Sequence, residues 1–237
     1  MTIQNECIGC IAAQSRRVCE AIHADEILSH TIIEYVETAL QTADFTLSPP
    51  VIAAPLYEQM AKLAHTDDLY REQKQHATIQ AKNYLPFLKE TITQSDDPLI
   101  ATLKTAVVGN VIDLAAEVSF NLHDAIMSVF TTPFAHDDTE ALRHALVNTK
   151  NLLYIGDNAG EHIFDALTIQ SLQKLYPQLS ITYMVRGNPI INDVTLSEAY
   201  EAEIEKICPV MDSGVPTPGF VYELASCEAQ KLFDSAD

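Results

Sequence analysis

An apolar run changes abruptly into a polar turn at Leu152-Leu153-Tyr154-Ile155-Gly156-Asp157-Asn158-Ala159-Gly160-Glu161. The run 152–155 is typical of a buried strand, and an amphipathic segment follows the turn. Unpaired carboxylates are strongly disfavoured in a protein core, so Asp157 and Asn158 should lie beyond the carboxyl end of the strand. In open α/β sheets ligands bind at this edge, because loops and helix N-termini meet there. Two adjacent oxygen donors at such an edge suggest a metal site.

A second apolar run, Ile181 to Val185, ends in another polar loop, Arg186 to Asp193. The apolar residues between the two runs recur at roughly helical spacing and are Ile163, Phe164, Leu167, Leu172 and Leu175. This pattern predicts a β-α-β unit. Crossovers of this kind make the two strands parallel, so both polar loops leave from the same edge of the sheet. Asp157, Asn158 and Asp193 can therefore converge.

The remainder of the chain divides into a helical part and an α/β part. Residues 1–130 carry apolar side chains at three- and four-residue intervals, which predicts a helical, bundle-like region. Residues 131–237 are predicted to form a Rossmann-like, three-layer arrangement of helices on a parallel sheet, with the boundary in the polar segment 131–150. A third strand is predicted at Ile204 to Val210, ending at the same sheet edge. We therefore expect the α/β class.

Further motifs lie along most of the chain. They are Cys7-Ile8-Gly9-Cys10, Asp68-Leu69-Tyr70 with Lys74, Asp97-Pro98-Leu99, Gly109-Asn110-Val111-Ile112-Asp113, Gly156 to Glu161 with Phe164-Asp165, and Arg186-Gly187 with Pro189-Ile190-Ile191-Asn192-Asp193. In residue type and order these motifs resemble the metal-dependent damage-control phosphatases, formerly catalogued as domain of unknown function 89. The resemblance covers most of the chain and does not depend on one motif.

The resemblance implies a divalent metal held by Asp157, Asn158 and Asp193, which are then also the candidate catalytic residues. It implies hydrolysis of phosphate monoesters of small metabolites such as sugar phosphates. The residues agree with that chemistry, because all three offer hard oxygen donors, which suit magnesium or manganese and are a poor set for structural zinc. The resemblance also implies manganese, cobalt or nickel as the metal, and this ligand set permits all three.

Arg186 has two interpretations. An isolated arginine at the end of a strand is commonly a solvated charge. Its place at the edge that carries the metal-ligand candidates favours contact with the substrate phosphate, which suits a planar guanidinium. In the mechanism, Arg186 and the backbone N–H groups that follow Asn158, at Gly160 and Glu161, stabilise charge on the phosphate. Asp157 acts as general base or as nucleophile, and the sequence does not separate these roles.

The first polar turn also has a purely structural interpretation. Asn158 and Glu161 have the spacing of a capping box, which would only start a helix. Capping does not explain why Asp157 stands on the strand side, nor the acidic loop at Asp193. His162 is the histidine nearest this turn, and it is predicted to be an exposed helix residue.

The helix predicted after Asp97-Pro98 carries Asn110, Asp113 and Glu117 on one face. A polar stripe of this kind is usually a solvated face. Gly109 is a poor helix former in an otherwise strong helix, which indicates close approach of another backbone or of a ligand. The family resemblance places this stretch at the active-site cleft, so Asn110 and Asp113 are candidate substrate-binding residues.

Composition limits the classes of partner. The chain has 237 residues, 47% of them hydrophobic, and a formal net charge of −19. A large core is therefore expected, whereas binding to nucleic acid or to anionic membranes is opposed by charge. The sequence contains no recognisable signal peptide or membrane span, so a cytoplasmic location is expected. The five cysteines should be free thiols, and Cys7-x-x-Cys10 lacks the second pair of a zinc site.

The C-terminal end departs from the family pattern. The chain stops at Asp234-Ser235-Ala236-Asp237, where the family continues into a further strand and a loop with a phosphate-contacting lysine. The resemblance therefore implies an α/β region that is incomplete at its C-terminal end, with phosphate anchoring and turnover affected. The sheet then lacks an edge strand unless another chain covers that edge, as in a homo-oligomer.

Two other classes of function stay open from the sequence. A methyltransferase would bind S-adenosylmethionine at the Gly156 to Gly160 loop, but the glycine spacing does not match a dinucleotide fingerprint and Asp193 has no role. A non-catalytic, acidic interaction protein on a degenerate enzyme fold is favoured by the short C-terminus. The phosphatase interpretation, with a small phosphorylated metabolite as partner, uses both polar loops.

Overall fold

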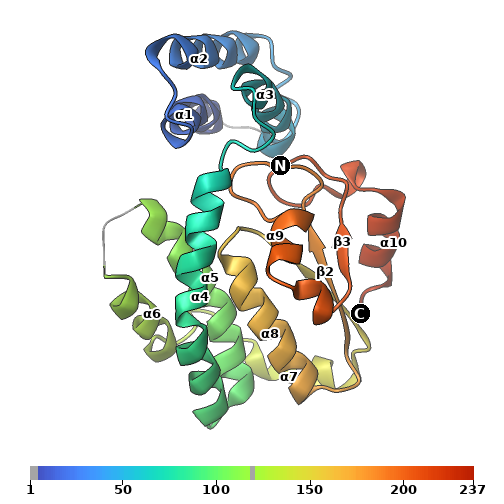
Figure 1. The fold of residues 1–237 in the computed structure, drawn as a ribbon. Helices are drawn as coiled ribbons and strands as arrows, with labels where there is room; N and C mark the ends of the chain where they lie inside the picture. The colour runs from blue at the N-terminus through green and yellow to red at the C-terminus, as the bar shows by residue number, and fades with distance from the viewer. Residues whose placement is uncertain (1–4, 118–120) are drawn as a thin grey trace.

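The computed structural model describes the backbone of residues 5–117 and 121–237, and the side chains of residues 6–111 and 121–237 (Figure 1). The first part of the chain contains α1 (Asn5–Ala21), α2 (Glu26–Gln41), α3 (Pro49–Leu63), α4 (Arg71–Gln94), α5 (Pro98–Glu117) and α6 (Leu122–Thr131). The second part contains α7 (Thr139–Asn148), β1 (Asn151–Ile155), α8 (Glu161–Leu175), β2 (Ser180–Val185), α9 (Leu196–Glu201), η1 (Ile204–Lys206), β3 (Val210–Asp212), η2 (Tyr222–Leu224) and α10 (Cys227–Ser235). The first part is helical, and the strands lie in the second part, where they alternate with helices.

The strands of the described residues form one parallel sheet in the order β1-β2-β3. Ile155 pairs with Met184, and Val185 pairs with Asp212. The loops that follow the three strands consequently leave from a single edge of the sheet. The predicted β-α-β unit is confirmed.

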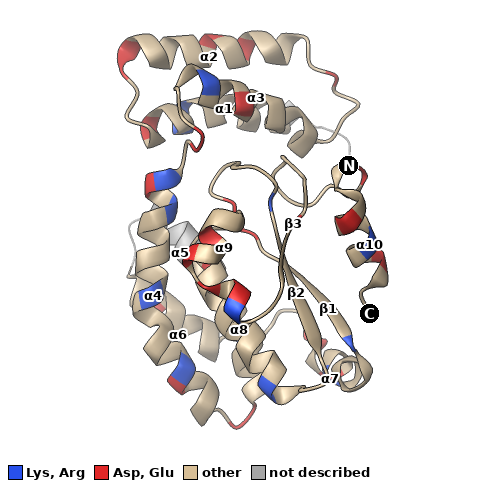
Figure 2. Ribbon diagram, turned by 45° about the vertical axis from the view of Figure 1, so that its right-hand side comes forward, with Lys and Arg blue, Asp and Glu red and all other residues tan. Residues whose placement is uncertain are grey.

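Helices cover both faces of this sheet. In Figures 1 and 2, α8 lies on one face, with α4 and α5 outside it, and α10 lies on the opposite side of the strands. Ile169 of α8 and Ile181 of β2 belong to the core between helix and sheet. Phe164 packs in a second core with Leu88 of α4 and Val108 of α5. The α/β class is confirmed, and the helical part shares a core with the α/β part.

Helices α1–α3 form a separate cluster above the carboxyl edge of the sheet (Figure 1). Their buried residues include Val18, Ile32 and Met60, one from each helix. Ile190, from the loop after β2, is buried in the same cluster. The loop that carries Asp193 is thereby attached to the helices above it.

The third strand differs from the prediction. Ile204 to Lys206 form the 3₁₀ turn η1, and the strand occupies only Val210–Asp212. Ile204 is fully buried in the core shared with α9, so it has the apolar character of a strand residue without being in one. The backbone joins the sheet at Pro209, whose carbonyl accepts a hydrogen bond from the N–H of Tyr183 at 2.9 Å. Apolar character alone does not separate these conformations.

Local signals mark several helix starts. Helix α3 begins at Pro49 after Ser48, because a proline in the first turn lacks only an N–H that would have no partner in the helix. The Asp25 side chain caps α2 by accepting a hydrogen bond from the N–H of Leu28. Among the described residues, no helix is both long enough and apolar enough to cross a membrane.

Candidate metal centre

The loops after β1 and β2 meet at the carboxyl edge of the sheet. Asn158 and Asp193 form an isolated antiparallel bridge. The N–H of Val194 donates a hydrogen bond to the carbonyl of Asp157 at 2.7 Å. The three metal-ligand candidates thus come from two short segments that backbone hydrogen bonds hold side by side.

Arg186 lies between the two candidate carboxylates and is almost fully buried. Its Nε donates to Oδ2 of Asp193 at 2.6 Å, and its Nη2 donates to Oδ1 of Asp157 at 2.8 Å. Its Nη1 donates to the carbonyl of Gly156 at 3.1 Å. The interpretation of Arg186 as a solvated charge is therefore wrong. In this structure the guanidinium orients the carboxylates, and its contact with a substrate phosphate stays a prediction.

The two carboxylates differ in exposure and therefore in electrostatics. The side chain of Asp157 is 59% exposed, whereas that of Asp193 is 5% exposed. Burial raises the pKa of Asp193 to about 6, against the opposing effect of the Arg186 charge and with a smaller contribution from the nearby Asp157. With both carboxylates ionised, the pair and Arg186 keep a net negative charge, which attracts a cation.

Glu161 orients the amide of Asn158. The Nδ2 of Asn158 donates to Oε1 of Glu161 at 3.2 Å, and the Nδ2 of Asn110 donates to Oε2 at 3.4 Å. Since the nitrogen of Asn158 faces Glu161, its Oδ1 points to the other side of the amide, as a metal ligand requires. Helix α8 begins at Glu161, and its N-cap Gly160 makes no side-chain cap. The capping-box interpretation is therefore wrong.

Helix α5 approaches Glu161 closely at Gly109. A Cβ added at Gly109 would lie 2.9 Å from Cγ of Glu161. The neighbour is therefore a side chain, which corrects the prediction of another backbone or a ligand. Asn110 is exposed on the same helix and contacts Glu161. Asp113 and Glu117 belong to α5, but their side chains lie outside the described residues. Their predicted place at the cleft stays a prediction.

His162 is buried, which corrects the prediction of an exposed residue. Its Nδ1 accepts a hydrogen bond from the N–H of Gly160 at 2.9 Å, so that amide is already used within the protein. Burial lowers the pKa of His162 to about 4, and the imidazole is neutral at pH 7. Gly160 has φ +97°, and a Cβ there would lie 3.0 Å from Cβ of Ala77 on α4. The adjacent Ile163-Phe164 could have revealed that α8 is buried on more than one face.

The donor set fits a hard divalent cation. Two carboxylates and an amide oxygen are ligands that magnesium and manganese accept. Within the described part of the chain, no group of three or more His, Cys, Asp and Glu residues is arranged to hold a metal, so a centre at this edge depends on Asn158 as a ligand. All five cysteines are free, as predicted.

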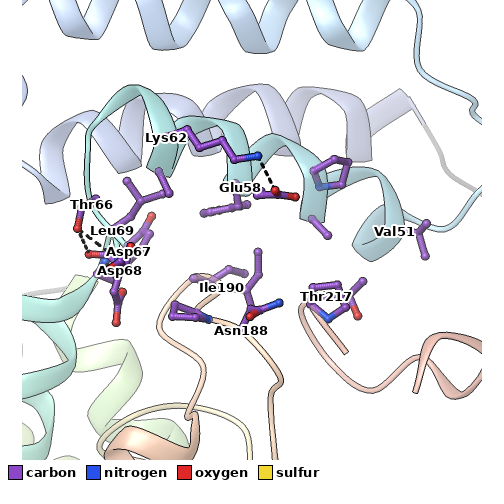
Figure 3. Close-up of a pocket in the computed structure, with 18 of the residues that line it drawn as sticks. Val51, Glu58, Lys62, Thr66, Asp67, Asp68, Leu69, Asn188, Ile190 and Thr217 are labelled. Carbon is purple, nitrogen blue, oxygen red and sulfur yellow. Dashed lines mark hydrogen bonds and ion pairs between the residues drawn. The ribbon is translucent and has the colours of Figure 1, made fainter. Parts of the chain in front are cut away.

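A cavity of about 610 Å³ lies next to the loop that joins Arg186 to Asp193 (Figure 3). Asn188 and Ile190 form one wall, and α3 forms the opposite wall. The apolar lining residues are Val51, Ala54, Pro55, Tyr57, Ala61, Leu69, Tyr70, Pro189, Ile190, Ile191, Pro216 and Leu224. Glu58 and Lys62, which pair at 2.6 Å, lie on the α3 side. Sequence reasoning missed this space because its walls come from three parts of the chain that are far apart in sequence, 51–70, 188–191 and 216–224.

A family model for the damage-control phosphatase ARMT1-like domain matches residues 3–237. The chain belongs to this family. The match extends over nearly the whole sequence, which confirms the family resemblance and the predicted phosphohydrolase class. It favours that class over the methyltransferase and the non-catalytic interaction protein.

Two relatives and one solved structure are similar over the full chain. A damage-control phosphatase of Pyrococcus horikoshii is 26% identical over 239 residues, covering 100% of this chain and 82% of the relative. A damage-control phosphatase of Archaeoglobus fulgidus is 27% identical over 246 residues, covering 100% and 83%. The crystal structure of a DUF89 family protein from P. horikoshii matches with a TM-score of 0.89 and 26% identity, covering 100% of this chain and 82% of that one. These similarities support the fold described above.

Proposed function

We propose that the chain is a metal-dependent phosphatase that hydrolyses phosphate monoesters of small metabolites, sugar phosphates among them. Asp157, Asn158 and Asp193 would hold manganese, cobalt, nickel or magnesium. The observation that carries the proposal is the antiparallel bridge between Asn158 and Asp193, because it joins oxygen donors from two loops at the sheet edge where ligands bind. The five free cysteines are compatible with the cytoplasm as the location.

The residues of the chain would divide the chemistry between them. A divalent ion supplies positive charge that neutralises phosphate oxygens and makes a water molecule more acidic. Asp157 has the accessible carboxylate, so it is the group that can take a proton from water or attack phosphorus. Arg186 keeps Asp157 and Asp193 in one arrangement before the substrate arrives. Glu161 keeps the oxygen of the Asn158 amide turned away from α8.

The organic part of the ester would extend toward the cavity between α3 and the 188–191 loop. The support is continuity, since Asn188 and Ile191 line the cavity within the same loop that carries Arg186 and Asp193. A cavity of about 610 Å³ has the size of small-molecule sites. Its mixed apolar and polar walls suit a hydroxylated organic group.

The first experiment measures phosphate release from a panel of sugar phosphates with added Mn²⁺. Wild-type protein should release phosphate only with the metal, and Asp157→Ala and Asp193→Ala should be inactive. Asp138→Ala is the matched control, because this exposed carboxylate makes no side-chain cap at the start of α7. Equal rates in all four proteins would reject the proposed function.

The second experiment tests where the organic group lies. Ala54→Phe would narrow the cavity from the α3 side. We expect hydrolysis of six-carbon sugar phosphates to fall several-fold in kcat/KM, while hydrolysis of glycerol phosphate stays near the wild-type rate, because only the larger group needs the space. A uniform change for both substrates would place the organic group elsewhere.

A further inference from the structure

Helix α8 carries a buried carboxylate near enough to Asp157 for the two charges to interact. Asp165 of α8 is almost fully buried. It accepts hydrogen bonds from the hydroxyl of Tyr154 at 2.6 Å and from the hydroxyl of Tyr183 at 2.8 Å. Burial raises the pKa of Asp165 to about 6, and the two tyrosine hydroxyls oppose that effect. A carboxyl group placed in a core at this cost is expected to have a specific task.

The two tyrosines come from neighbouring strands. Tyr154 of β1 and Tyr183 of β2 are partners in the parallel register, so both side chains leave the sheet on the same face. Their ring centroids are 5.8 Å apart, and both hydroxyls end at Asp165 on α8. Figure 2 shows β1 and β2 side by side with α8 packed against them. One carboxylate therefore positions two rings.

The ring of Tyr183 lies against the turn that leads to the metal-ligand candidates. A Cβ added at Gly156 would lie 2.2 Å from the Tyr183 hydroxyl oxygen and 2.5 Å from the carbon that bears it. The N–H of Gly156 donates to the carbonyl of Met184, and its carbonyl accepts from Arg186. Gly156 is thus enclosed on three sides, and Asp157 is the next residue.

We propose that Asp165, acting through Tyr183, is a positioning residue for the Gly156–Asp157 turn and thereby sets the affinity of the centre for its cation. Asp165 holds the hydroxyl of Tyr183, and the end of that ring limits how far Gly156 can move. Groups that orient metal ligands commonly change metal affinity by about 10- to 100-fold when they are removed. The inference rests on the proposed function, because it assumes that the cation binds at Asp157.

The chain supplies a matched pair of variants for the test. Tyr183→Phe and Tyr154→Phe each remove one hydroxyl that donates to the same carboxylate. The atoms nearest a Cβ at Gly156 all belong to Tyr183, and the hydroxyl oxygen is the nearest of them. Tyr183→Phe therefore removes the closest contact with the turn and frees the ring from Asp165, whereas Tyr154→Phe removes no atom that faces the turn. Similar losses of stability are expected for the two variants, and a purely structural role predicts no other difference.

The measurement is Mn²⁺ binding by isothermal titration calorimetry, with the unfolding temperature recorded for each protein. Tyr183→Phe should raise the Mn²⁺ dissociation constant about 10-fold, and Tyr154→Phe should leave it near the wild-type value. Asp165→Asn, which keeps the size of the side chain, should weaken binding as Tyr183→Phe does. Wild-type binding combined with equal dissociation constants for the two tyrosine variants would overturn this inference and leave the proposed function intact. A wild-type protein that binds no Mn²⁺ would overturn both.

Discussion

Lys74 is a fully buried cation, and its removal should lower the free energy of unfolding. Its side chain is 2% exposed, and its Nζ lies 2.6 Å from Oδ2 of Asp68 and 2.7 Å from Oε1 of Glu198. Glu198 also accepts hydrogen bonds from the N–H and the hydroxyl of Thr195 in the capping box that starts α9. Lys74 therefore ties the beginning of α4 to the segment that follows Asp193.

Lys74→Met should leave two poorly solvated carboxylates without their cation. Breaking a buried ion pair by removing one partner costs about 3–5 kcal/mol, so the free energy of unfolding should fall by about that amount at pH 7. Urea denaturation followed by circular dichroism measures it. A slope of about 3 kcal/mol per M would put the midpoint about 1 M or more below the wild type.

Lys62→Met is the matched control. Lys62 and Glu58 pair at the same distance of 2.6 Å, but their side chains are 62% and 68% exposed. An exposed pair of this spacing on a helix contributes at most about 0.5 kcal/mol. The difference between the two methionine variants therefore isolates the effect of burial.

The loss of unfolding free energy in Lys74→Met should depend on pH. Burial acts to raise the pKa of Glu198, but the hydrogen bond and charge of Lys74, with the bonds from Thr195, outweigh burial and lower it. A lowered pKa in the folded protein contributes stability that is present above the ordinary value of 4.5 and is lost as the pH falls through the folded value. Wild type should lose this contribution in acid, so the gap between wild type and Lys74→Met should narrow there.

The triple variant with Lys74→Met, Asp68→Asn and Glu198→Gln tests the cause directly. Neutral side chains of similar size should recover most of the lost stability, because no unpaired charge is left in the core. A cost below about 1 kcal/mol for Lys74→Met, or no recovery in the triple variant, would refute the electrostatic argument.

Two further predictions concern the site itself. Gly109→Ala should weaken Mn²⁺ binding, because the added Cβ would displace Glu161 and free the amide of Asn158. Gly9→Ala is the control: its Cβ meets open space, so this variant should stabilise α1 by about 0.5–1 kcal/mol and leave Mn²⁺ binding unchanged. Equal Mn²⁺ titration curves for the two variants would contradict this prediction. Because the pKa of Asp165 is raised in the folded protein, this group contributes stability that is fully present below its ordinary pKa of 3.8 and is lost as the pH rises through about 6. Asp165→Asn should therefore lose less unfolding free energy than the wild type between about pH 4 and about pH 7. Parallel pH profiles of the two proteins, measured by urea denaturation, would show that Asp165 does not titrate in this way.

Local patterns in the chain were sufficient for the β-α-β unit. Alternation between apolar runs and polar loops marks strand ends, and parallel strands necessarily send their loops to one edge. The neighbourhood of Asp157, Asn158 and Asp193 follows from these two facts. The family resemblance added the chemistry, and the family match bears out its phosphatase class.

Other predictions failed where packing decided the outcome. His162 was expected in solvent, but α8 is enclosed by the sheet on one side and by α4 and α5 on the other. Ile204 was expected in a strand, although it is buried as part of a 3₁₀ turn. In both cases the local sequence is compatible with two environments, and contacts between distant segments select one.

The amino-acid sequence by itself determined the first two strands, the helix between them and the edge of the sheet at which the oxygen donors emerge, because apolar periodicity is local and a crossover makes its two strands parallel. Only the tertiary structure decided what each donor touches. Arg186 joins both carboxylates, Glu161 turns the amide of Asn158, and Asp165 reaches the turn through Tyr183. These contacts join segments that are far apart in the chain. Packing between helices and strands sets the distances between such segments, and local sequence patterns do not encode them.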